Sequence, residues 1–171
     1  ISEFIYRLKY ARYNKQEKRR ETWGECVDRY IEMHKRKFGE QEKDRLEEVR
    51  EAIKEKRILP SMRGLQFGGS GIEEKNMRLY NCTSSYADRP RFFAEALWLL
   101  LCGSGVGFSV QKHHVGSLPT VRAPEGEAIL FVVPDSIEGW ADAVHCLIMS
   151  YLGNYAPVTF DFRSEEHTSE L

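Results

Sequence analysis

The order of strand-like and helix-like segments in the second half of the chain is the feature that most limits its fold. From Leu79 onward we expect a strand, a helix, two strands, a helix and a final strand. The run AILFVVP (residues 128–134) is continuously apolar, which is typical of a strand covered on both faces. Strands joined by helical crossovers are typical of α/β proteins. The sequence therefore predicts the α/β fold class.

Residues typical of helix ends flank both helices that we expect in this half. Asp88 is of a type that caps helices, and Pro90 would lie in the first turn of the helix that follows. The apolar face of that helix would consist of four large side chains, Phe93, Leu97, Leu100 and Leu101. Asp135 and Glu138 have the spacing of a capping box for the second helix, which Gly153 would end.

The first part of the chain is charge-rich and helical in pattern. Thr22 and Glu25 have the spacing of a capping box, and Gly39 is a typical stop. Between them, one helical face is apolar and contains Trp23, Val27, Tyr30, Ile31 and Phe38. A second amphipathic helix would place Leu46, Val49 and Ile53 on one stripe. From Ile58 the composition changes to the loop-like stretch ILPSMRGLQFGGSG, so we divide the chain into residues 1–57 and residues 58–162.

The last nine residues, RSEEHTSEL, have no periodic apolar face and follow directly after the strand-like APVTFDF. They also correspond, codon by codon, to the start of a common sequencing-library adapter. We therefore expect residues 163–171 to be a read-through artefact. The alternative is an acidic, disordered tail.

Bulk properties exclude several classes of function. The formal net charge is -1, which gives no overall attraction to nucleic acid or to a membrane surface. No apolar run reaches the roughly 18 residues that a transmembrane helix needs. The four cysteines form no CxxC pair and no cluster with zinc-ligand spacing, so we expect no metal site and a reducing, cytoplasmic location. The basic run from Arg7 to Arg20, with interleaved tyrosines, leaves open a nucleic-acid-binding module, although a solvated helix face is favoured.

Two features of the stretch RLYNCTSSYADRPRFFAEALWLLLCGSGVGFSVQ suggest a site. Its glycines follow a helix and precede a strand, the reverse of the order in a dinucleotide-binding loop. Gly103 and its neighbours therefore either cap the helix or let the backbone approach a ligand closely. Cys82 is either a small buried apolar residue or a reactive thiol. The residues alone leave both questions open.

Four motifs occur together in one order, and they resemble the N-terminal part of ribonucleotide reductases. The motifs are RRETWGECVDRY, LPSMRGLQFGG, the stretch from YNC to GFSVQ, and VVPDSIEGWADAV. Their sequences are most similar to those of the adenosylcobalamin-dependent, monomeric ribonucleoside-triphosphate reductases. The similarity extends from about Arg19 to Phe162. It implies a helical N-terminal region followed by the first strands and helices of a ten-stranded α/β barrel, which is incomplete here.

The resemblance also implies a chemistry. In this family a thiyl radical takes the 3′ hydrogen of the ribose, and a cysteine pair on neighbouring strands supplies the reducing equivalents that replace the 2′ hydroxyl. Cys82, in YNC, matches the first cysteine of that pair. Ser61 matches a residue that binds the substrate phosphates, Asn81 a position beside the ribose, and Ser104 and Gly105 a loop whose backbone borders the substrate.

Asp88 and Asp135 lie in segments near which the family binds a deoxynucleotide effector. The resemblance further implies adenosylcobalamin as cofactor, ribonucleoside triphosphates as substrates and a thioredoxin-type reductant. The radical cysteine, the second redox cysteine and the cobalamin-contacting regions match no residue here, so we expect this polypeptide to be an inactive fragment. The alternative within the family is a piece of another reductase class, which acts on diphosphates.

Overall fold

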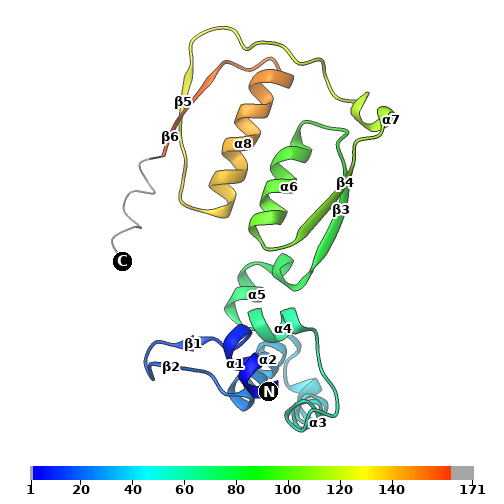
Figure 1. Ribbon diagram of the computed structural model, residues 1–171, viewed down its shortest axis with the longest axis vertical. Coiled ribbons are helices and arrows are strands. Elements are labelled where there is room, and N and C mark those ends of the chain that lie inside the picture. Colours follow the sequence, from blue (N-terminus) through cyan, green and yellow to red (C-terminus); the bar gives the residue numbers. More distant parts are fainter. Residues whose placement is uncertain (1, 163–171) are drawn as a thin grey trace. The chain divides into compact units, whose positions relative to one another are not determined.

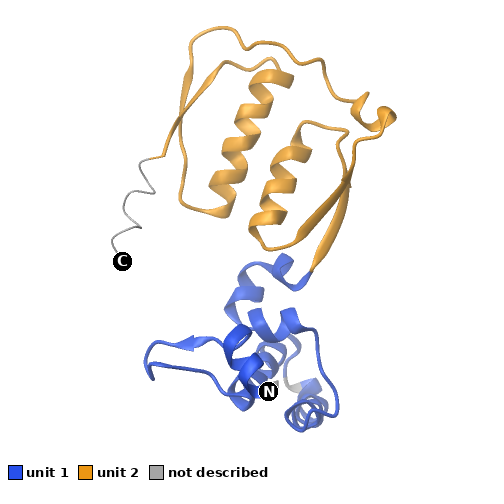
Figure 2. Cartoon of the chain, viewed as in Figure 1, with its two compact units in different colours: residues 1–80 blue, residues 81–171 orange. Residues whose placement is uncertain are grey.

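The computed structural model describes residues 2–162, so the predicted read-through tail, residues 163–171, lies outside the described residues. The chain divides into two compact units, residues 1–80 and residues 81–171 (Figure 2). The change in composition at Ile58 falls inside the first unit. No helix in the described part of the chain is long and apolar enough to span a membrane.

The first unit is mostly helical (Figure 1). Its elements in chain order are α1 (Ser2–Lys9), β1 (Tyr13–Asn14), β2 (Arg19–Arg20), α2 (Trp23–Phe38), η1 (Glu40–Glu42), α3 (Lys43–Lys54), α4 (Met62–Phe67), α5 (Ser70–Glu74) and η2 (Asn76–Leu79). The strands β1 and β2 form a short antiparallel hairpin inside the basic run. The prediction that the stretch from Ile58 to Gly71 is a loop was wrong for α4, whose residue Leu65 is buried in a hydrophobic cluster.

Helix α2 begins and ends where its sequence indicates. The Thr22 side chain accepts a hydrogen bond from the Glu25 N–H, and the Glu25 carboxylate accepts one from the Thr22 N–H, which confirms the capping box. Gly39, with φ 72°, follows the last residue. Phe38 was wrongly expected on the buried face: it is 53% exposed, because its ring stacks on His34 at the helix end and not in the core.

The core between α2 and α3 is small and apolar. Val27 and Ile31 of α2 form a buried cluster with Ile53 of α3, and Leu46 and Val49 pack against it. This is the predicted stripe of the second amphipathic helix, which is therefore confirmed. Burial of side chains of this kind is the main stabilising contribution to such a helix pair.

The second unit has the predicted order of strands and helices. Its elements are β3 (Cys82–Tyr86), α6 (Arg91–Leu101), β4 (Gly105–Ser109), α7 (Lys112–Val115), β5 (Ile129–Val132), α8 (Ile137–Leu152) and β6 (Val158–Asp161). Strand β3 pairs with β4, and β5 pairs with β6, both in parallel. Helices α6 and α8 lie side by side, with one strand pair on either side of them (Figure 1). The mixed α/β class is confirmed, and among the described residues the strands form separate two-stranded sheets.

The predicted N-caps of both long helices in this unit were wrong. Pro90 occupies the N-cap of α6 without a side-chain cap, and the Asp88 carboxylate instead accepts a hydrogen bond from Arg89 at 2.7 Å. At α8 the N-cap is Ser136, whose hydroxyl accepts from the Gly139 N–H at 3.0 Å. Ser136 has the extended backbone that an N-cap requires, and Asp135 lies one residue too early.

Several apolar side chains of this unit are exposed. Ile129 and Leu130 of β5 are 58% and 60% exposed, so the strand is not covered on both faces by described residues. Leu100 and Leu101, in the last turn of α6, are also exposed, so the expectation that they belong to the buried face was wrong. The described residues therefore leave apolar side chains of both β5 and α6 open to solvent.

Candidate functional site

Cys82 and Gly105 form the centre of the candidate site. They are the first residues of β3 and β4, and their Cα atoms are partners in the parallel pair. The Gly105 N–H donates a hydrogen bond to the Asn81 carbonyl at 2.8 Å. A Cβ built on Gly105 would lie 3.7 Å from the Cys82 Sγ. The thiol therefore lies beside backbone that carries no side chain, and Asn81, Cys82 and Gly105 are all exposed.

Of the two roles that the sequence left open for the glycines between α6 and β4, the structure shows the capping role. Gly103 has φ 89°, its N–H donates to the Leu100 carbonyl, and the Ser104 N–H donates to the Leu99 carbonyl. This pair of bonds is a Schellman motif, so Gly103 caps the helix. Gly105 has no part in this cap: a Cβ there would make ordinary van der Waals contact with Cys82, and approach of its backbone to a ligand stays a prediction. Ser104 is 3% exposed, which places its hydroxyl inside the unit.

Ser61 belongs to the first unit, apart from the other predicted substrate residues in the sequence. It is exposed and occupies the N-cap position of α4, where its carbonyl accepts from the Leu65 N–H at 3.1 Å. Its side chain makes no capping hydrogen bond. The hydroxyl is therefore not committed to the helix end.

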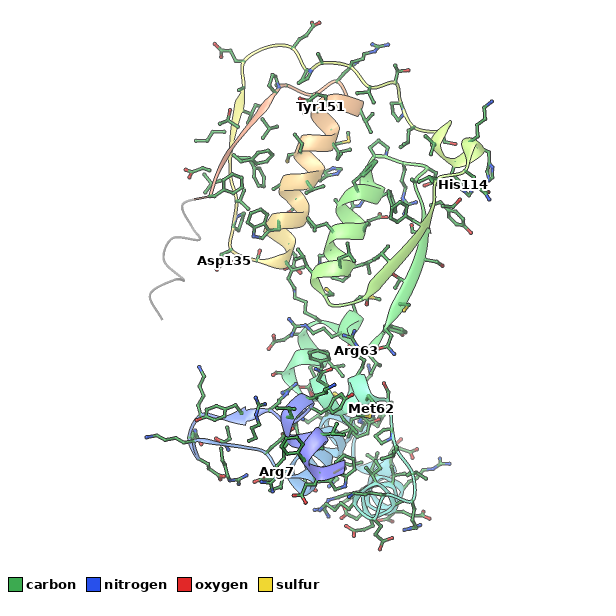
Figure 3. All side chains as sticks on the ribbon, in the orientation of Figure 1. Arg7, Met62, Arg63, His114, Asp135 and Tyr151 are labelled. Carbon is green, nitrogen blue, oxygen red and sulfur yellow. The ribbon has the colours of Figure 1, made fainter. Side chains whose placement is uncertain are left out.

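The two predicted effector residues precede the two long helices. Asp88 is half-buried and paired with Arg89, and Asp135 is exposed in the turn between β5 and α8 (Figure 3). Helices α6 and α8 pack against each other. A groove of about 480 Å³ runs between them.

His145 of α8 also lines that groove. The Nδ1 atom of His145 is buried and has no hydrogen-bond partner among the described residues. Trp98 lines the same groove and donates from Nε1 to the Glu138 carboxylate at 3.3 Å. Sequence alone gave no signal for His145, because it lies beside the apolar stripe of α8 and not in a recognisable motif.

The remaining thiols differ from Cys82 in their surroundings. Cys26 and Cys102 are buried, Cys146 is half-buried, and none of the four cysteines is in a disulfide in the described part of the chain. Burial raises the pKa of the Cys26 thiol and, together with the nearby Asp142, that of the Cys146 thiol. A raised pKa lowers the fraction of reactive thiolate. Cys82 is thus the exposed cysteine of the chain. The described residues hold no cluster of His, Cys, Asp or Glu that could bind a metal ion.

Comparisons with known proteins agree with the motifs. No family model matches the sequence. The chain is 28% identical to a probable adenosylcobalamin-dependent ribonucleoside-triphosphate reductase of Dictyostelium discoideum, over 96% of this chain and 26% of the relative. It is 28% identical to the adenosylcobalamin-dependent ribonucleoside-triphosphate reductase of Euglena gracilis, over 95% of this chain and 25% of that relative. The chain therefore spans about a quarter of the length of these relatives.

The fold leads to the same group of proteins. A crystal structure of a B12-dependent (class II) ribonucleotide reductase superposes with a TM-score of 0.78 at 20% identity, over 94% of this chain and 32% of that chain. The resemblance that the four motifs carry is thereby confirmed: the chain is similar in sequence to adenosylcobalamin-dependent ribonucleoside-triphosphate reductases and shares the fold of part of a class II ribonucleotide reductase.

Proposed function

We propose that this chain is part of an adenosylcobalamin-dependent ribonucleoside-triphosphate reductase, which converts ribonucleoside triphosphates to 2′-deoxyribonucleoside triphosphates. The observation that carries the proposal is the position of the exposed Cys82 thiol beside Gly105. A ribose could approach this thiol over the bare glycine backbone. The similarity to the two named reductases supports the same conclusion.

Cys82 would act as one thiol of a redox pair. In the overall reaction two thiols lose two hydrogen atoms and form a disulfide. The 2′ hydroxyl of the ribose leaves as water, and a hydrogen takes its place on the 2′ carbon. The partner thiol must come within disulfide distance of Cys82. Cys26 and Cys102 are buried and Cys146 lies within α8, so we assign the partner, and the cysteine that carries the thiyl radical, to segments other than this chain.

The other residues that the motifs single out would bind the substrate. Asn81 is exposed directly before the thiol and can hydrogen-bond to a ribose hydroxyl. Gly105 and the backbone after Ser104 would border the sugar, where any side chain would take up space. Ser61 would bind the phosphates with its uncommitted hydroxyl. In the whole enzyme, β3 and β4 would be among the first strands of the ten-stranded barrel, to which residues 58–162 would contribute.

The described residues do not by themselves fit adenosylcobalamin. One hollow lies between α6 and α8, and a second, of about 580 Å³, lies between α1, the start of α2 and the loop before α4. Neither includes Cys82, Asn81 or Gly105 in its lining. We therefore assign the cofactor to no residue of this chain and derive no step through it.

The resemblance also supports proposals about the effector, the protein reductant and the location of the enzyme. Asp88 and Asp135, which precede the packed helices α6 and α8, would lie near a deoxynucleotide effector. A thioredoxin-type protein would reduce the disulfide. We propose a monomeric enzyme of the cytoplasm, where cysteines outside disulfides, as in the described part of this chain, persist.

The test uses the full-length parent protein with a ribonucleoside triphosphate, adenosylcobalamin and a dithiol reductant. Formation of the deoxynucleotide is followed by chromatography. Cys82→Ser should abolish turnover, whereas Cys146→Ser, a matched change in the same unit, should retain it. The isolated 171-residue chain should show none. Full turnover by Cys82→Ser would refute the role of the thiol, and turnover by the isolated chain would refute its status as a fragment.

A further inference from the structure

Two arginine side chains of the first unit converge on one glycine. Arg12 follows α1, and Arg78 lies in η2, so they come from distant parts of the sequence. A Cβ built on Gly71 would lie 3.3 Å from Arg12 Nη2 and 3.6 Å from Arg78 Nη1. The two guanidinium groups therefore face the same small volume above a backbone that has no side chain.

Neither of these guanidinium groups has a carboxylate partner among the described residues. The Arg12 side chain donates from Nε to the Gln66 carbonyl at 3.1 Å, and no ion pair is formed by Arg12 or Arg78. Other arginines of the unit are neutralised, such as Arg29, which pairs with the buried Glu21 at 2.7 Å. The two guanidinium groups above Gly71 thus lack a direct ion pair among the described residues, although the Glu21 carboxylate, which accepts from the Arg12 backbone N–H, partly offsets their charge.

This convergence is unfavourable without a ligand. Burial lowers the pKa of Arg12, the positive charges of Arg29 and Arg78 lower it further, and the negative charge of Glu21 opposes them only in part. Arginine nevertheless stays protonated at any physiological pH, so the repulsion cannot be relieved by loss of a proton. An anion between the two groups would relieve it and would accept charge-assisted hydrogen bonds from both.

We propose that Arg12, Arg78 and the bare backbone at Gly71 form a binding site for a phosphate-type oxyanion. Two guanidinium forks suit the geometry of a phosphate group. The site lies within the first unit, on residues other than those proposed for the reductase reaction, and it does not depend on that reaction. The same chemistry would accept a free inorganic phosphate compound or the phosphate end of a nucleotide.

The first experiment titrates the 171-residue chain with inorganic pyrophosphate by calorimetry at low ionic strength. Arg78→Gln should weaken binding by about tenfold or more, the effect of one lost charge-assisted hydrogen bond. The matched control is Arg7→Gln, which removes an exposed α1 arginine that is already paired with Glu3 (Figure 3). This control should leave binding unchanged. If Arg7→Gln weakened binding as much as Arg78→Gln, the effect would be one of net charge and the proposed site would be wrong.

A second variant tests the geometry without altering charge or the arginines. Gly71→Ala places a methyl group at the point where both guanidinium groups converge, within a helix that favours alanine. It should weaken pyrophosphate binding while the free energy of unfolding stays the same or rises. Unchanged binding in both Gly71→Ala and Arg78→Gln, or no binding to the unaltered chain, would overturn the proposal. Parallel titrations with tripolyphosphate and ATP identify the source, because a nucleotide site would bind ATP more tightly.

Discussion

Gly105 lies directly opposite Cys82 in the parallel β3–β4 pair, so that a Cβ at Gly105 would make ordinary van der Waals contact, 3.7 Å, with the Cys82 Sγ. A single methyl group is therefore tolerated at Gly105, whereas a branched side chain would cover the thiol. The rate at which the Cys82 thiol is alkylated should therefore report whether Gly105 lies opposite it.

We expect Gly105→Val to slow the alkylation of Cys82 by iodoacetamide severalfold and Gly105→Ala to change it little. Rates are obtained by mass spectrometry of the modified peptide under native conditions. In the unaltered chain Cys82 should react before the buried Cys26 and Cys102. Equal rates for Gly105→Val and the unaltered chain would show that the thiol does not lie over Gly105.

Replacement of the cap of α8 should destabilise the chain, but replacement of the residue before it should not. Ser136→Ala removes the hydroxyl that accepts from the Gly139 N–H and should cost about 1 kcal/mol. The matched change Asp135→Ala should stay within about 0.5 kcal/mol, as for ordinary surface positions. Urea unfolding followed by circular dichroism measures both. A larger cost for Asp135→Ala would restore the capping role that the sequence had suggested for it.

Two apolar residues of α2 should differ sharply in their effect on stability. Ile31 is 1% exposed in the cluster with Val27 and Ile53, so Ile31→Ala should cost about 2–5 kcal/mol through lost burial and a cavity. Phe38→Ala removes a larger side chain from an exposed position and should cost much less. Urea titrations give the free energy of unfolding of each variant. A similar loss of stability in Ile31→Ala and Phe38→Ala would contradict the structure.

The ion pair at the start of α2 should make stability depend on pH. Hydrogen bonds from the Arg19 guanidinium, at 2.6 and 2.8 Å, and from Thr22 hold the pKa of Glu25 below its usual range. A lowered pKa contributes stability above the unfolded value of about 4.3, and this contribution is lost as the pH falls below it.

Glu25→Gln keeps a capping amide but removes the charge, so its free energy of unfolding should fall less on acidification than that of the unaltered chain. Glu48→Gln, at an exposed carboxylate without an ion pair among the described residues, is the control and should follow the unaltered chain. Added salt should reduce the difference, since the pair is exposed. If the free energy of unfolding changed equally with pH in all three proteins, the Arg19–Glu25 ion pair would not contribute to stability.

Local signals in the sequence predicted local structure well. The capping box joins Thr22 to Glu25 and the Gly39 N–H bonds to the Lys35 carbonyl, so each signal acts within about one helical turn, and both are found. The order of strands and helices in the second unit also follows from local periodicity. At α8, two neighbouring residues, Asp135 and Ser136, are both of the capping type, and only the backbone conformation decides between them.

Burial and pairing depend on distant contacts and were harder to predict. The apolar composition of β5 indicated a covered strand, but exposure depends on which strands pair with it. For the candidate site, the resemblance pointed to Cys82 and Gly105 separately. Their contact follows from the register of β3 against β4, which no local pattern specifies. The convergence of Arg12 and Arg78 is likewise invisible in the sequence, since they are separated by most of the first unit.

The Schellman motif at the end of α6 leaves no spare residue before β4, which begins at Gly105 immediately after Ser104. An insertion or deletion of one residue there would bring Ser104 or Val106 opposite Cys82 and turn alternate side chains to the other face of the strand. The stretch between α7 and β5 has no regular element and no such constraint. Natural variants of this protein should therefore differ in length between α7 and β5, and keep one fixed length between α6 and β4.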